Sequence, residues 1–190
     1  MAGAASLPFM MSGRREGEPI AGAVRLPEPI QTDLPETSGP FEIDGWRVTP
    51  VAGYSLDAHV LQRKRYRWDD LSPIVPLDLA LSWGVSSDPE VIRQMEMFQS
   101  GRFLHWRIPL DTGLDPGEIS RSSSNVHVIP ATPEVREVLL DFEAGDRVHL
   151  EGVLVDLEDQ EGRIWKSSRT RKDVGAGACE ILFVQVARFV

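Results

Sequence analysis

Short segments in which apolar and polar residues alternate recur from residue 41 to the end of the chain, and proline or glycine ends most of them. Alternation with a period of two is typical of half-buried β-strands. The last segment is apolar at nearly every position, so we expect it at the centre of a sheet, covered on both faces. The pattern predicts strands over residues 46–51, 56–60, 77–83, 103–108, 126–129, 148–157, 163–167 and 180–190, with a hairpin turn at 52–54.

Within residues 148–157, the apolar side chains move from one side of the expected strand to the other at Glu151 and Gly152. A glycine at such a change is typical of a β-bulge, which bends a strand. Bent strands allow a sheet to close on itself. We therefore predict a mainly β (α+β) fold, an OB-like, partly closed antiparallel β-barrel with two short peripheral helices.

The two helices are predicted from their first residues. Thr132 followed by Pro133 provides an N-cap and a proline at the first helical position, and apolar residues then share one side as far as residue 142. Ser87 or Asp88 before Pro89 likewise provides an N-cap followed by proline, and it predicts a helix whose apolar stripe extends to residue 98.

Residues 1–40 differ in composition from the rest of the chain. They contain 6 of the 14 prolines and 5 of the 16 glycines, which interrupt any helical or strand period. We predict a Pro/Gly-rich extended tail over residues 1–40, lying on a partner or on its own domain, and a single β-rich domain over 41–190. The 150 residues of that domain are enough for one hydrophobic core.

Charge and cysteine content exclude several classes of protein. The chain of 190 residues has a formal net charge of -9, which argues against binding to nucleic acid or to an anionic membrane surface. Its single cysteine excludes an internal disulfide and a CxxC site. No apolar run approaches the roughly 18 residues of a membrane span. We expect a cytoplasmic location by default, with membrane association through a partner left open.

Five blocks of sequence together resemble an uncharacterised bacterial family. That resemblance covers about residues 41–188 and implies no established activity. It implies that relatives often carry an N-terminal membrane segment, where this chain has its proline-rich tail. The blocks are SPIVPLDLALSWG (72–84), QSGRF (99–103) with Trp106, SNVHVIPA (124–131), GDRVHLEG (145–152) and WKSSRTRKDVGAGACE (165–180).

The segment from Arg169 to Glu180 is the first candidate site. Basic side chains precede two glycines there, and glycine backbone can present N–H groups to an anion. The spacing differs from that of a P-loop, and a strand follows instead of a helix, so a structural loop is the alternative. The candidate ligand-binding residues are Arg169, Arg171, Asp173, Gly175 and Gly177.

Cys179 and His127 form a candidate nucleophile and base, with Asn125 or Asp173 to orient the imidazole. A lone cysteine at the start of an apolar strand is more often a small buried hydrophobic residue. The four histidines lack metal-ligand spacing, so we expect neither a metal nor another cofactor.

One basic run, 63–68, is interleaved with aromatic residues as in proteins that bind single-stranded nucleic acid, but Asp69 and Asp70 follow it at once. The chain lacks a strong catalytic signature. We therefore predict a non-catalytic binding or assembly module, an accessory subunit that engages a protein partner or larger complex through its tail and barrel loops. A small Cys/His-dependent hydrolase is the alternative.

Overall fold

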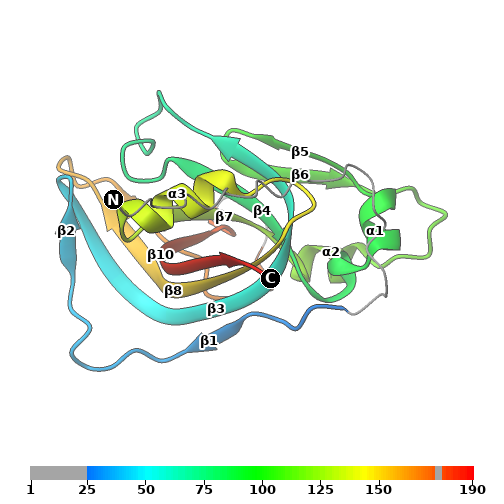
Figure 1. Cartoon of the computed structure of the whole chain (residues 1–190), viewed down its shortest axis with the longest axis horizontal. Helices are drawn as coiled ribbons and strands as arrows, with labels where there is room; N and C mark the ends of the chain where they lie inside the picture. Colours follow the sequence, from blue (N-terminus) through cyan, green and yellow to red (C-terminus); the bar gives the residue numbers. More distant parts are fainter. Residues whose placement is uncertain (1–24, 174–176) are drawn as a thin grey trace, which may run out of the picture.

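The computed structural model describes residues 25–173 and 177–190 (Figure 1). The described chain is mainly β, as predicted, with three α-helices instead of two and one short 3-10 helix. The strands are β1 (Ile30–Thr32), β2 (Phe41–Ile43), β3 (Trp46–Arg65), β4 (Leu77–Ser82), β5 (Glu96–Ser100), β6 (Phe103–Arg107), β7 (Ser123–Pro130), β8 (Arg147–Glu158), β9 (Ile164–Trp165) and β10 (Glu180–Phe189). The helices are η1 (Gly84–Ser87), α1 (Pro89–Gln94), α2 (Pro116–Arg121) and α3 (Pro133–Asp141).

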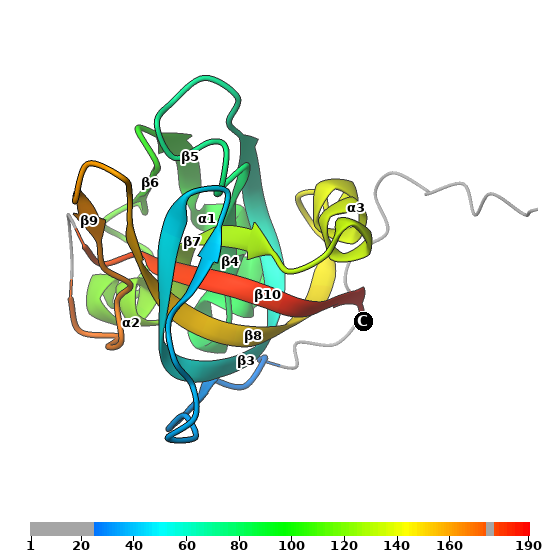
Figure 2. The same ribbon diagram turned by 90° about the vertical axis from the view of Figure 1, so that its left-hand side faces the viewer.

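Five strands pair in a ring. β3 pairs with β4, β4 with β7, β7 with β10, β10 with β8, and β8 with β3 again. The expectation of an entirely antiparallel sheet was wrong, because β7 and β10 run parallel. The chain leaves β7 through α3 and β8, so β10 enters the gap between β7 and β8 in the same direction as β7 (Figure 2). The central position predicted for the last strand is confirmed. The expected cover on both faces holds only for its first half, because residues 185–189 are exposed or half-buried.

The hairpin predicted over residues 46–60 was wrong, since β3 is one strand of 20 residues. Its first part pairs with β8 and its second part with β4, and register shifts near Val51 and Leu61 allow it to bend. Gly53 is not at a turn. It leaves room for the side chain of Thr32, because β1 lies against β3 there.

The bulge expected at Gly152 lies in the neighbouring strand. The register between β8 and β10 shifts between Val184 and Val186, opposite this glycine. A Cβ atom at Gly152 would overlap the carbonyl oxygen of Phe183. The glycine therefore permits close approach of β10, while the irregularity itself is in β10.

The helix predicted at residue 132 is confirmed. The Thr132 side chain accepts a hydrogen bond from the Val135 N–H (3.3 Å), and α3 packs against β10 and β7. The helix predicted at residue 89 ends at Gln94, whereas its expected stripe reached Phe98. Residues 96–100 instead form β5, which pairs with β6 through a turn at Gly101 and Arg102, both with positive φ. The period of two in this hairpin outweighs the helical spacing.

Two large clusters of buried apolar side chains and one small cluster form the core. The larger of the two joins β3, β4, β7, β8 and β10 with α3 and contains Trp83 and Phe142. The second contains Leu157 and Ile181, beside the site described below. The small cluster consists of Val91, Met95 and Ile119. Leu26 belongs to the larger cluster, and its backbone N–H donates to Ser87 Oγ (2.9 Å). Residues 25–40 thus contribute to the core, while residues 1–24 of the expected tail lie outside the described part.

Among residues 25–173 and 177–190, no helix has the length and hydropathy that crossing a membrane requires.

Candidate functional site

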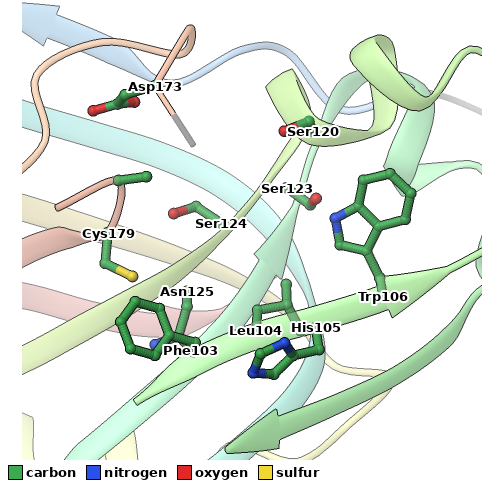
Figure 3. Close-up of a pocket in the computed structure, with 11 residues that line it drawn as sticks. Phe103, Leu104, His105, Trp106, Ser120, Ser123, Ser124, Asn125, Asp173 and Cys179 are labelled. Carbon is green, nitrogen blue, oxygen red and sulfur yellow. The ribbon is translucent and has the colours of Figure 1, made fainter. Parts of the chain in front are cut away.

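Three cavities adjoin where the β5–β6 hairpin meets the segments on either side of β9. The Ser124 cavity, about 270 Å³, is bounded by β6, the first residues of β7, Asp173 and Cys179 (Figure 3). The Trp165 cavity, about 380 Å³, includes Leu71, Trp165, His127 and Cys179 in its wall. The Asp69 cavity, about 440 Å³, includes Asp69, Leu71 and Trp165. The first two share Phe103 and Cys179, and the last two share Leu71, Gly101, Arg102 and Trp165.

A fully buried carboxylate, Asp78, lies behind the Trp165 cavity. Asp78 is in β4, and its Oδ1 accepts hydrogen bonds from Arg102 Nη1 (3.1 Å) and His127 Nδ1 (2.8 Å). Its Oδ2 accepts one from Asn125 Nδ2 (3.2 Å). A buried charge is tolerated only with such partners, so Asp78 fixes three side chains at once.

Arg102, in the β5–β6 turn, uses most of its guanidinium N–H groups for contacts within the protein. It binds both carboxylate oxygens of Asp69 (2.9 and 2.7 Å), Asp78, and the carbonyl oxygen of Val75 (3.0 Å). Its guanidinium carbon also lies 4.0 Å from the centre of the Tyr66 ring. These contacts leave Arg102 little capacity to bind an anionic ligand.

His127 lies in β7 and contributes to the wall of the Trp165 cavity. Asp78 has only acceptor oxygens, so the imidazole donates from Nδ1. In the neutral ring this places the lone pair on Nε2. His127 therefore offers one oriented hydrogen-bond acceptor to a ligand.

Cys179 lies between the Ser124 and Trp165 cavities, just before β10. Its thiol donates a weak hydrogen bond to the carbonyl oxygen of Arg102, with Sγ 3.9 Å from that oxygen. Burial, followed by the charges of Glu180 and Asp78, raises the pKa of the thiol to about 12. The group is therefore a neutral thiol near pH 7 and a poor nucleophile.

The structure places Cys179 beside each of the other two candidate catalytic residues, but in different cavities. Cys179 and His127 share the wall of the Trp165 cavity, whereas Cys179 and Asp173 share that of the Ser124 cavity. Asp173 accepts a hydrogen bond from Ser168 Oγ (2.7 Å) and does not orient the imidazole. Figure 3 shows Asp173 and Cys179 on the side of the cavity opposite Trp106.

Arg171, a candidate ligand-binding residue, is held by its own protein. Its guanidinium forms an ion pair with the buried Glu180 (2.8 Å) and donates to Tyr54 Oη (2.9 Å). Glu180 also accepts a short hydrogen bond from Ser124. Burial raises the pKa of Glu180 despite these partners. This network ties the segment after β9 to β3 and β7.

The remaining candidates of the segment 169–180 have different positions. Arg169 is exposed, and its carbonyl oxygen accepts a hydrogen bond from Gln31 Nε2 (3.4 Å). Gly177 has positive φ and lines the Trp165 cavity, whereas Gly175 lies outside the described residues. Anion binding by this segment stays a prediction. In the described part of the chain, no three His, Cys, Asp or Glu side chains gather as metal ligands do.

Side chains of the basic run 63–68 form hydrogen bonds with other elements of the fold. Arg63 and Arg65 both donate to the carbonyl oxygen of Leu140, near the end of α3 (2.7 and 2.6 Å). Lys64 donates to the carbonyl oxygen of Gln99 in β5 (3.2 Å). Cations at the C-terminal end of a helix stabilise its unpaired carbonyls.

Asp78 and Arg102 hold the site together, yet neither was predicted as a site residue. Asp78 was counted as the polar member of an alternating strand, although β4 is buried along its whole length. Its partners lie 24, 47 and 49 positions away, so no local motif marks them. The available signal was an ionisable residue with apolar neighbours on both sides, at the second position of β4.

Comparison of the chain with protein-family models, with curated proteins and with solved structures gave no match. The resemblance to an uncharacterised bacterial family therefore stays a prediction.

Proposed function

We propose that this protein is a non-catalytic binding module, an accessory subunit that takes hold of a protein partner in the cleft formed by the Trp165 and Asp69 cavities. One observation carries the proposal. Segments from distant parts of the chain form the walls of these adjoining cavities, and the wall of the Trp165 cavity includes His127, whose imidazole is oriented by Asp78. A concave, mainly apolar site with a few fixed polar groups is typical of ligand recognition.

We propose further that the ring of five strands is OB-like, and this assignment favours the same site. Counted along the chain, the ring strands β3, β4, β7, β8 and β10 are the first to the fifth, and α3 stands between the third and fourth. OB-folds bind ligands on the face of their second and third strands, between the first and fourth connections. Here Leu71 lies in the first connection, His127 in the third strand, and Trp165 and Cys179 in the fourth connection.

The charges favour a protein over a nucleic acid as the partner. Phosphates would need several free cations, yet Arg102 is occupied by Asp69, Asp78 and Val75. Among the described residues that line the two cavities, Lys166 is the other Lys or Arg. Asp69 and Asp70 also line the Asp69 cavity, in a chain of net charge -9. A role for the N-terminal tail in the complex, and the cytoplasmic location, remain parts of the prediction.

Site-specific crosslinking in the native host tests the proposal. A photoreactive phenylalanine analogue replaces Ile164, which is 59% exposed and lines the Trp165 cavity. The matched control carries the analogue at Glu137, an exposed residue of α3, which lies far from β9 in Figure 2. We expect a discrete crosslinked protein only from position 164, weakened by Phe103→Glu at the cavity wall. Equal crosslinking from both positions, or none from 164, would refute the proposal.

A Cys/His-dependent hydrolase is the second candidate, because His127 and Cys179 do share one cavity. Turnover of p-nitrophenyl acetate by the purified protein tests it. A hydrolase would lose that turnover in both Cys179→Ala and His127→Ala. We expect no turnover above that of the two variants, since the half-buried thiol stays protonated near pH 7.

A further inference from the structure

We propose that the Trp165 cavity receives a tyrosine side chain of the partner, with the phenol O–H donating to His127 Nε2. The inference rests on the proposed function and names the group that the cleft recognises. It follows from three properties of this cavity: its apolar wall, its volume and the acceptor that His127 directs into it.

The wall suits an aromatic ring. Most of it is apolar, from Leu71 and Val75 on one connection to Leu157 and Ile181 on the strands. The Trp165 indole adds an aromatic surface, and aromatic pairs are more favourable than area alone predicts. A volume of about 380 Å³ is sufficient for one ring and too small for an extended polymer segment.

The polar end selects for a neutral donor. His127 Nδ1 is fixed by Asp78 at 2.8 Å, so Nε2 is the position open to a ligand. Arg102, which could attract a carboxylate or phosphate, already binds two carboxylates and a carbonyl. Lys166, the other Lys or Arg among the described lining residues, is exposed, and its ammonium is strongly hydrated. A phenylalanine ring would leave the Nε2 acceptor buried without a partner, which costs free energy. A phenol satisfies both the apolar wall and the acceptor.

Binding of small side-chain analogues to the full chain tests this inference. The probes are p-cresol, which carries the tyrosine hydroxyl; 4-methylanisole, in which a methyl group replaces the donated proton; and toluene, the phenylalanine analogue. We expect p-cresol to bind about 3- to 10-fold more tightly than the other two, the size of one net hydrogen bond. In protein with labelled histidine rings, the NMR chemical shifts of His127 should change as p-cresol fills the site, whereas those of His149 should stay constant.

Two variants separate recognition from folding. His127→Phe keeps an aromatic ring in the wall but removes the acceptor, so the p-cresol preference should disappear while toluene still binds. His105→Phe changes an exposed ring of the Ser124 cavity and should leave the preference intact. Retention of the native fold by both variants is checked by their melting temperatures.

Each outcome bears on the inference. Equal binding of p-cresol and 4-methylanisole, no binding of any probe, or tighter binding of 3-methylindole would overturn recognition of tyrosine. Crosslinking from position 164 would still support the cleft as a binding site in those cases. Conversely, a p-cresol preference without any crosslink would support the phenol pocket and refute the protein-partner function.

Discussion

Asp78 and His127 occupy directly paired positions in β4 and β7, and Asp78 Oδ1 accepts a hydrogen bond from His127 Nδ1 at 2.8 Å. Both residues lie on strands of the central ring, so the backbone pairing sets their orientation. Side chains held by regular elements are positioned more accurately than those on loops. The hydrogen bond therefore gives the Trp165 cavity a fixed acceptor before any ligand arrives.

Asp78→Ala should destabilise the protein strongly. Removing one member of a buried charged pair leaves the other without compensation and typically costs about 3 to 5 kcal/mol. Here Arg102, Asn125 and His127 would lose a shared acceptor. The measurement is the free energy of unfolding in urea.

Asp70→Ala is the matched control for that experiment. Asp70 pairs with Arg163 at 3.1 Å, but its side chain is 73% exposed. Exposed ion pairs contribute less than about 1 kcal/mol. Equal losses in the two variants would contradict a central role for Asp78.

Gly152→Ala should also destabilise, through overlap with the backbone of β10 at Phe183. Forced overpacking typically costs about 1 to 3 kcal/mol. Gly39→Ala serves as control, because a Cβ atom at Gly39 would have no neighbour within 4 Å. The measurement is the melting temperature of each variant compared with that of the parent. If Gly152→Ala had the melting temperature of the parent, β10 would be able to shift away from the added Cβ atom at little cost.

Local signals predicted the elements whose causes are local. The Thr132–Pro133 cap identified α3, and the apolar 180–190 segment identified the central strand. A capping residue followed by proline also begins α2, at Asp115 and Pro116, but that helix was not predicted. Residues 52–54 were mistaken for a turn because the partner strand that explains Gly53 lies elsewhere in the chain.

The candidate site was predicted only in part, because it depends on long-range pairing. Cys179 and His127 were selected for their chemistry, and the parallel pairing of β10 with β7 brings their segments together. The orienting carboxylate was assigned to Asp173 or an amide at Asn125, whereas strand register places Asp78 beside the imidazole. Register between strands is not encoded in a local pattern.

Stability should depend on pH through Glu180. Burial raises its pKa in the folded protein above the ordinary value of 4.5. The resulting stability is fully present below the unfolded pKa and is lost as pH rises through the folded one. We therefore expect the stability of the parent, relative to Glu180→Gln, to fall as the pH rises above 4.5 in urea titrations. If the parent instead gained stability relative to Glu180→Gln as the pH rises, the charge of Arg171 would lower the pKa of Glu180 by more than burial raises it.

Leu26→Ala should weaken the fold, although this residue lies in the proline-rich segment. Leu26 is 2% exposed within the larger core cluster, and truncation of a buried leucine costs about 2 to 5 kcal/mol. Ile30, 65% exposed in β1, is the control, and Ile30→Ala should change little. Unfolding free energies from urea titrations compare the two. Identical values would mean that residues 25–40 only rest on the domain.

The reactivity of Cys179 separates the binding module from the hydrolase. A rise in thiol pKa from 9.0 to about 12 lowers the thiolate fraction near pH 7 about a thousandfold. Iodoacetamide should therefore label the native protein far more slowly than the urea-unfolded protein at pH 7.4, as followed by mass spectrometry.

Raising the pH should accelerate labelling of the native protein, because a larger fraction of the thiol ionises as pH approaches its pKa. His127→Ala should leave the rate at pH 7.4 unchanged, since the Cys179 thiol makes its hydrogen bond to the Arg102 carbonyl oxygen. Rapid labelling of the native parent that is lost in His127→Ala would mean that the imidazole ionises the thiol. That result would favour the hydrolase, because a thiolate beside a base is the nucleophile such an enzyme needs.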